Sequence, residues 1–151
     1  MVTSIFVNLP TSDVERAKAF FSGLGWSINP AFTDEKSACV VIDDNLFLMI
    51  LTTDFFRTFT KKPIVDPSAA AQTQVAFSRE SRAAVDEMLE RVSAAGGTET
   101  GEVQDYGFMY ARDFEDPDGN WFSALWMDPV AAEKGPQAFL AEQELPTSAP
   151  S

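Results

Sequence analysis

The stretch Asp105–Pro129, with the sequence DYGFMYARDFEDPDGNWFSALWMDP, carries the strongest structural signal in the chain. Two aromatic-rich segments, Phe108–Phe114 and Trp121–Met127, flank an Asp-Pro-Asp-Gly turn at Asp116–Gly119. Proline presets the second position of such a turn and glycine accepts a positive φ at the fourth, so a β-hairpin is predicted. Both strands have bulky residues on both faces, which predicts a helix on one side and a cavity or partner subunit on the other.

The first third of the chain predicts a strand, a helix and three further strands. The helix begins after Ser12, an N-cap that Glu15 completes as a capping box, and it ends at Gly25. Alternating apolar residues and intervening turn residues predict the strands. They are Val2–Leu9, Trp26–Phe32, Ser37–Ile42 and Leu46–Leu51.

The same order of elements recurs after residue 71. Ser81 caps a second predicted helix, which Gly96 and Gly97 end. The strands predicted around it are Gln72–Ser78, Glu99–Gln104, Phe108–Phe114 and Trp121–Met127. An internal duplication of one βαβββ module is the simplest organisation, so the fold class is α+β with two such modules.

We expect a single domain over residues 1–129, which fits the usual size of about 100 to 200 residues per domain. Its modules cover 1–53 and 72–129, and residues 54–71 connect them. Phenylalanines in this connection predict a short helix that covers a cleft; they are Phe55, Phe56 and Phe59.

A C-terminal extension at 130–151 is rich in Pro, Ala, Glu and Ser, and we expect it to be partly disordered. Within it, Gln137–Gln143 predicts one or two helical turns and Leu145–Ser151 a loose end.

The chain is strongly acidic, with 23 acidic residues, 11 basic residues and a net charge of −12. This charge argues against nucleic-acid and anionic-membrane partners and favours a neutral or cationic ligand, although solubility alone also explains it. The only cysteine, Cys39, lies in an apolar run and predicts a buried side chain in a reducing, cytoplasmic protein. No signal peptide or membrane-spanning segment is predicted.

The last hairpin resembles that of the vicinal oxygen chelate superfamily, which includes glyoxalase I, extradiol dioxygenases, and fosfomycin and bleomycin resistance proteins. The resemblance rests on the Asp-Pro-Asp-Gly turn and on the strand that ends Leu-Trp-Met-Asp-Pro. Three shorter stretches support it: Phe6–Pro10, Gly23–Trp26 and Asp105–Met109. It covers residues 2–129 and implies half-barrel sheets that close around a cup, commonly with modules paired across a homodimer.

The chain contains no histidine, which excludes histidine-based catalytic triads and histidine-rich metal sites. The resemblance implies metal ligands at Phe6, at Met49 or Ile50, at Gln74 and at Ser123. None of these is His, Asp or Glu, so we expect no metal and no cofactor, and metal-dependent glyoxalase or dioxygenase activity becomes improbable. The acidic turn Asp113–Asp118 lacks the spacing of a calcium loop.

Side-chain alternation defines the predicted cup. Because Ser123 takes the inward position of the family, Trp121 lies with it, while Trp126 takes the opposite face. The same alternation places Asn8 beside Phe6 and makes Gln74 inward. Either these side chains bind a ligand, or Phe6 and Trp121 fill the cup as core.

The strand Phe108–Phe114 adds three candidate ligand-binding residues: Phe108, Tyr110 and Arg112. Arg112 is expected either to meet an anionic ligand or to pair with an acidic side chain. Asp105 with Tyr106 is either the edge of a site or a surface turn.

The leading hypothesis is a metal-independent small-molecule binding protein, with an aromatic, acidic-rimmed pocket for a small organic molecule that is cationic or aromatic. We expect a homodimer, because one module leaves sheet edges exposed. One alternative is an enzyme of lyase or isomerase type that uses Tyr106, Tyr110, Asp105 or Glu102 as acid or base. Another is a protein of this fold whose cup is filled by its own side chains.

Overall fold

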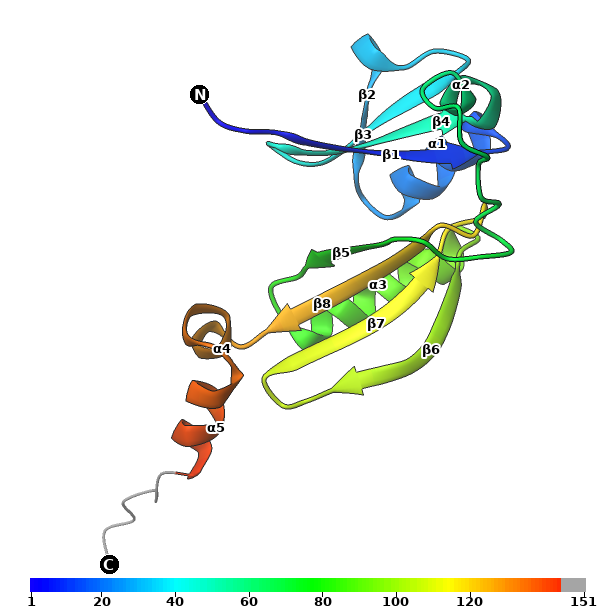
Figure 1. The fold of residues 1–151 in the computed structure, drawn as a ribbon. Coiled ribbons are helices and arrows are strands. Elements are labelled where there is room, and N and C mark those ends of the chain that lie inside the picture. The colour runs from blue at the N-terminus through cyan, green and yellow to red at the C-terminus, as the bar shows by residue number, and fades with distance from the viewer. Residues whose placement is uncertain (145–151) are drawn as a thin grey trace, which may run out of the picture.

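A computed structural model of the chain describes residues 1–144 and contains two modules with the same topology (Figure 1). The first has a four-stranded sheet of order β1-β4-β3-β2, in which β1 pairs with β4 in parallel. Its elements are β1 (Ile5–Thr11), α1 (Val14–Gly23), β2 (Ser27–Asn29), the 3-10 helix η1 (Pro30–Phe32), β3 (Ser37–Asp43) and β4 (Leu46–Thr52).

The second module repeats this arrangement, with strand order β5-β8-β7-β6 and a parallel pairing of β5 with β8. Its elements are β5 (Gln74–Ser78), α3 (Arg82–Ala94), β6 (Thr98–Asp105), β7 (Met109–Glu115) and β8 (Trp121–Met127). The predicted α+β fold of two βαβββ modules is therefore confirmed.

The segments outside the modules are helical in part. The connection begins with α2 (Thr53–Arg57), the short helix predicted from its phenylalanines. After β8 the chain forms α4 (Pro129–Lys134), which was not predicted, and α5 (Pro136–Glu144). The predicted loose end, residues 145–151, lies outside the described part of the chain. Within that part, no helix is long and apolar enough to cross a membrane.

The helices begin close to where the sequence predicts. Ser81 caps α3 by accepting a hydrogen bond from the N–H of Ala84 at 3.0 Å. The N-cap of α1 is Asp13 rather than Ser12, because the Asp13 carboxylate accepts from the N–H of Arg16 at 3.1 Å. The Ser12 side chain instead contacts Asp118 in the other module.

One hydrophobic core lies between the two modules, on the helix side of both sheets. Phe21 of α1 packs edge-on against Phe122 of β8 with ring centroids 5.8 Å apart, and Phe20 lies 6.5 Å from Phe114. Trp26 packs in the same way against Phe77 at 5.0 Å. Since the helix sides face each other, the opposite faces of the two sheets point outward.

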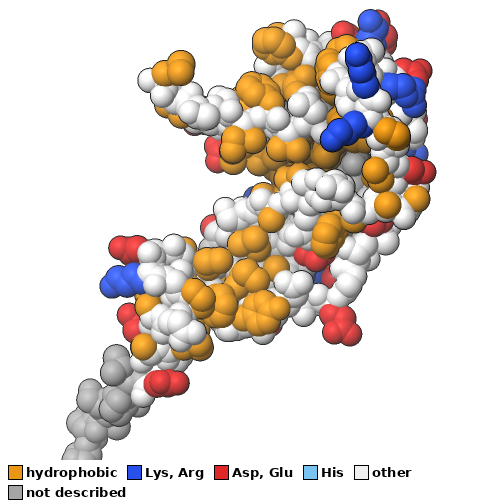
Figure 2. Space-filling view, in the orientation of Figure 1, with side chains coloured by type: hydrophobic (Ala, Val, Ile, Leu, Met, Phe, Trp, Pro, Cys, Tyr) orange, Lys and Arg blue, Asp and Glu red, His pale blue; other side chains and the backbone are white. Residues whose placement is uncertain are grey.

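The outward direction of the two open sheet faces shows that the prediction of one shared cup was wrong. β1 and β5 are edge strands, so within the described chain the two sheets do not close around a single cup. The two modules diverge from the connection (Figure 1). On the side of the molecule away from the connection, a groove of about 650 Å³ separates them, and Figure 2 shows it as a deep hollow. Apolar side chains line much of this groove, including those of Ile5, Trp26, Phe47 and Phe77.

The turn of the last hairpin fastens the second module to the first. Asp118 accepts hydrogen bonds from the hydroxyl of Thr11, from the N–H of Ser12 and from Arg16. Asn120 donates its side-chain amide to the carbonyl of Pro10 at 3.1 Å and to Asp116 at 3.0 Å. The end of β1 is therefore held against the start of β8, and this junction forms the floor of the site described next.

Candidate functional site

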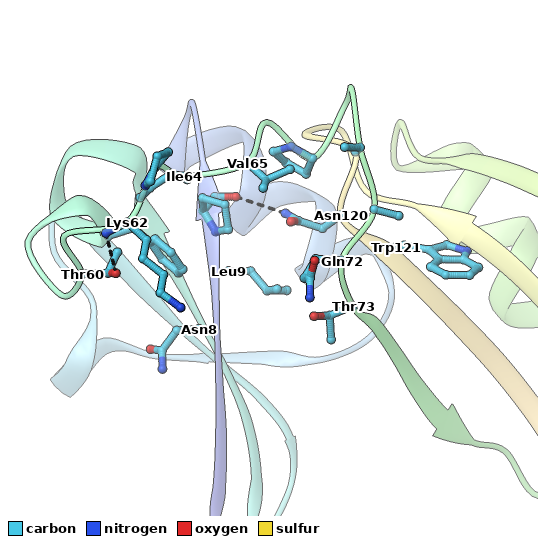
Figure 3. A pocket seen from close by; sticks show the side chains of 17 residues that line it. Asn8, Leu9, Thr60, Lys62, Ile64, Val65, Gln72, Thr73, Asn120 and Trp121 are labelled. Carbon is cyan, nitrogen blue, oxygen red and sulfur yellow. Dashed lines mark hydrogen bonds between the residues drawn. The ribbon is translucent and has the colours of Figure 1, made fainter.

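A pocket of about 410 Å³ lies where the connection crosses the ends of β1 and β8 (Figure 3). Four groups of residues line it. They are Asn8, Leu9 and Pro10 of β1; Phe56, Thr60, Lys62, Pro63, Ile64, Val65, Pro67, Ala70 and Ala71 of α2 and the connection; Gln72 and Thr73 before β5; and Gly119, Asn120 and Trp121 at the start of β8. This volume is within the range of about 300 to 1,000 Å³ that small-molecule sites occupy.

The connection forms the apolar roof of the pocket. Ile64 and Val65 lie over Leu9 (Figure 3), and Phe56 reaches the pocket from α2. The predicted cleft-covering helix therefore supplies one pocket side chain, whereas Phe59 lies beyond its end and is 60% exposed.

Polar side chains lie at both ends of the pocket. The side chain of Lys62 extends toward Asn8 (Figure 3). The backbone N–H of Lys62 donates to the Thr60 hydroxyl at 3.1 Å. Gln72, Thr73 and Trp121 line the other end (Figure 3). Of the described residues that line the pocket, Lys62 alone is charged, so the predicted acidic rim was wrong for this pocket.

Close packing holds the far side of the connection in place. Asp66 accepts hydrogen bonds from the N–H and the hydroxyl of Ser68 at 2.9 and 2.7 Å, and the hydroxyl bond lowers the pKa of Asp66. Gly119 has a φ of +96°, and a Cβ there would lie 2.7 Å from the Cα of Ser68. Glycine is therefore required where the hairpin turn meets the connection.

The structure brings two of the predicted site residues, Asn8 and Trp121, to this pocket. Gln72, rather than Gln74, reaches it. Phe6 is 55% exposed and stacks on Phe47 with ring centroids 4.8 Å apart, on the outward face of the first sheet.

Gln74 and Ser123 belong to the outward face of the second sheet. Ser123 pairs with Ala76 of β5 and Asp113 of β7, and its neighbours Phe122 and Ala124 are in the core. The predicted alternation along β8 is confirmed. Phe6 and Ser123 nevertheless lie on different sheets whose open faces point away from the shared core, so one chain does not bring them together.

Tyr110 and Arg112 do not lie with Ser123, which corrects their grouping in one cup. They pair with Trp126 and Ala124 across β7 and β8, and paired residues share a face, so both point toward the helix side. The Tyr110 hydroxyl donates to Asp86 of α3 at 2.6 Å. Arg112 donates to Asp86 at 2.9 Å and to Glu99 at 2.6 Å, so the alternative of pairing with acidic side chains is confirmed.

These contacts also bear on the predicted acid and base residues. The hydrogen bond to Asp86, together with burial, raises the pKa of Tyr110, which moves it further from neutral pH. Asp105 accepts from Arg82 at 2.7 Å, and this bond lowers the pKa of Asp105. Neither group lines the pocket.

Phe108 packs outside the pocket as well. It lies in the turn before β7, where its ring is 6.1 Å from Phe139 of α5 and 6.0 Å from Tyr106. Its carbonyl accepts from the N–H of Asp128 at 2.7 Å. Phe108 therefore attaches the C-terminal helices to the second module.

The positions where the superfamily resemblance implies metal ligands do not fit a metal. Ile50 is fully buried in the core, so Met49 is the residue of β4 on the outward face with Phe6. A phenyl ring, a thioether, an amide and a hydroxyl form a poor donor set for a divalent cation. Within residues 1–144, no group of three or more His, Cys, Asp or Glu side chains is placed to hold a metal ion.

Sequence reasoning missed the residues that the connection contributes, above all Lys62, Ile64 and Val65. The connection has no periodic pattern, so nothing in it predicts which side chains point inward. The Lys-Lys-Pro stretch at 61–63 was the available signal, because it places cations beside apolar residues that follow a proline.

The comparisons with known proteins agree with this architecture. Residues 3–43 match the family described as bleomycin resistance protein-like N-terminal. No curated protein matches the chain by sequence.

Many solved structures share the fold. An enzyme of the glyoxalase/bleomycin resistance protein/dioxygenase family from Burkholderia phytofirmans is 16% identical with a TM-score of 0.69, covering 83% of this chain and 99% of its own. A glyoxalase-related enzyme from Fulvimarina pelagi is 19% identical with a TM-score of 0.68, covering 86% and 89%. A fosfomycin resistance protein from Listeria monocytogenes is 19% identical with a TM-score of 0.62, covering 85% and 97%. The paired-module fold of these structures and the match of residues 3–43 agree with the resemblance to the vicinal oxygen chelate superfamily.

Proposed function

We propose that this chain is a metal-independent small-molecule binding protein whose ligand site is the pocket under the connection. The observation that carries the proposal is the lining of that pocket. Apolar side chains such as those of Leu9, Phe56 and Ile64 form much of its lining, and a few polar side chains, including Asn8, Lys62 and Gln72, reach it. Such a combination is typical of small-molecule sites.

The exposure of Trp121, at the end of the pocket away from Lys62 (Figure 3), also supports this proposal. Its side chain lines the pocket and is 37% exposed, so a large aromatic surface remains uncovered by the protein. An organic ring that stacks on this indole would remove apolar area from water, which stabilises the complex.

The donor set at Phe6, Met49, Gln74 and Ser123 supports metal independence, since these side chains hold a divalent cation poorly. Ligand binding through apolar contact and hydrogen bonds needs no metal.

We also propose that two copies associate. The stacked rings of Phe6 and Phe47 lie on the outward face of an open sheet, and the edges of β1 and β5 are unpaired within the described chain. Exposed edges and apolar faces of this kind are usually covered by another chain.

A thermal-shift screen of aromatic metabolites and antibiotics, followed by calorimetric titration, tests the proposed site. Ile64→Ser changes the roof, and we expect it to weaken binding of a hit by about 1 to 2 kcal/mol, because apolar contact is lost. Val103→Ser is the matched control, since Val103 is 47% exposed and does not line the pocket. Equal affinity of the hit for Ile64→Ser and the parent protein would place the ligand elsewhere.

A further inference from the structure

The pocket is locally positive in a strongly negative chain. The net charge is −12, yet Lys62 is the one charged side chain among the described residues that line the pocket. Figure 2 shows basic side chains over α2 and the connection with acidic ones beside them; Arg57 is paired with Asp54 at 2.8 Å, whereas Lys61 and Lys62 have no ion-pair partner in the described chain. Clustered charge of one sign raises the local concentration of ligands of the opposite sign.

The charge of Lys62 is not used by the protein itself. Within residues 1–144 five of the six arginines form ion pairs, but the Lys62 ammonium has no ion-pair partner. Its side chain extends toward Asn8 (Figure 3), whose amide likewise has no hydrogen-bond partner in that part of the chain. An ammonium and an amide N–H are both donors, so together they fit an acceptor group.

The rest of the pocket determines the other half of the ligand. Leu9, Phe56 and Ile64 are among the residues that surround its volume of about 410 Å³ with apolar surface. A ligand that matches both parts has an apolar body and one anionic end. A single ammonium balances one negative charge, which favours a carboxylate over a doubly charged phosphate ester.

We infer that the pocket selects a small carboxylic acid with an apolar, ring-containing body, whose carboxylate accepts hydrogen bonds from Lys62 and Asn8. This inference rests on the proposed function and specifies its ligand class. It replaces the cationic ligand expected from net charge, because no acidic side chain is among the described residues that line this pocket.

Three probes with one ring system and different charges test the inference: naphthylacetate, naphthylacetamide and naphthylethylammonium. We expect the carboxylate to bind most tightly and the ammonium least tightly in calorimetric titrations. Raising the salt concentration should reduce the difference, because mobile ions screen a partly exposed charge.

Two neighbouring lysines provide matched variants. Lys62→Gln should lower the affinity for naphthylacetate about fivefold and leave the affinity for naphthylacetamide unchanged. Lys61→Gln removes the same charge from the neighbouring residue, whose side chain does not line the pocket, so it should lower the affinity for naphthylacetate much less than Lys62→Gln does and leave the affinity for naphthylacetamide unchanged.

The outcomes separate the two proposals. If the three probes bind with equal affinity, or if both lysine variants lower carboxylate binding equally, carboxylate selection by Lys62 is wrong and the binding function stands. If none of the probes and no hit of the screen binds, the proposed function fails and the inference fails with it.

Discussion

Asp118, in the turn of the last hairpin, lies 2.7 Å from the guanidinium of Arg16 on the first helix, and its side chain is 6% exposed. The same carboxylate accepts from the N–H of Ser12 at 2.9 Å. One nearly buried acidic residue thus joins the two modules beside the candidate pocket.

Replacing Asp118 is expected to destabilise the protein strongly. Asp118→Ala leaves the donors of Arg16 and Ser12 without their acceptor, so we expect the free energy of unfolding to fall by about 2 to 4 kcal/mol. Urea denaturation measures this change. Asp54→Ala removes a surface ion pair with Arg57 and should change stability by less than about 1 kcal/mol. Similar losses in both variants would contradict the buried role of Asp118.

Asp116 predicts a specific pH dependence of stability. Burial is the main cause that raises its pKa to about 6, against donors from Asn120 that lower it. The folded state therefore binds the proton more tightly than the unfolded state. Protonation of Asp116 therefore stabilises the folded state. This stabilisation is complete below the unfolded pKa of 3.8 and is lost as the pH rises through about 6.

Comparison with the Asp116→Asn variant isolates the contribution of Asp116, because all other carboxylates titrate in both proteins. Between about pH 4 and pH 6 the free energy of unfolding of the parent protein should fall relative to the variant by on the order of 3 kcal/mol. Urea denaturation series at several pH values give the difference. Parallel stability curves for the two proteins would show that Asp116 does not titrate in this range.

The two tryptophans of β8 should respond differently to truncation. Trp121 lines the pocket, whereas Trp126 packs against the core and under the Arg82 guanidinium, 5.1 Å from its ring centroid. Trp121→Ala should weaken ligand binding by about 1 to 3 kcal/mol with a modest loss of stability. Trp126→Ala should lower the free energy of unfolding by about 3 to 5 kcal/mol. Calorimetric titration and urea denaturation of both variants check this, and the reverse pattern would show that Trp121 is a core residue.

Metal content can be measured directly. Because the side chains at the family's ligand positions bind cations weakly, we expect elemental analysis after dialysis against a chelator to show no stoichiometric metal. Added zinc, nickel or iron should leave the melting temperature unchanged. One tightly bound metal per chain would overturn metal independence.

The proposed association of two copies predicts a mass of twice that of one chain in light scattering at micromolar concentration. Phe6→Ser should shift the protein toward the monomer, because it removes an exposed ring from the open face of the first sheet. A parent protein that is already monomeric at this concentration would contradict the proposed dimer.

The sequence contained most of the fold and only part of the site. Alternation along β8 correctly separated Trp121 from Trp126, because side chains two apart share a face. The positions of Tyr110 and Arg112 depend on how β7 pairs with β8. Counting back from the turn, Glu115 lies opposite Trp121 and Arg112 opposite Ala124, so the register across the hairpin could have excluded them.

The remaining site residues depend on tertiary packing. The positions of Ile64 and Val65 follow from contacts between the connection and the hairpin turn, such as the close approach of Gly119 to Ser68. Such contacts join segments far apart in sequence and leave no local pattern. The direction of the open faces likewise follows from packing between helix sides, as between Phe21 and Phe122, which neither module determines alone.

A crystal structure of the protein with naphthylacetate tests the central claim most directly. The account predicts ligand density under the connection, with the ring between Ile64 and Trp121 and the carboxylate at Lys62 and Asn8. Density on an outward sheet face beside Phe6 or Ser123, with the pocket under the connection left to solvent, would contradict it.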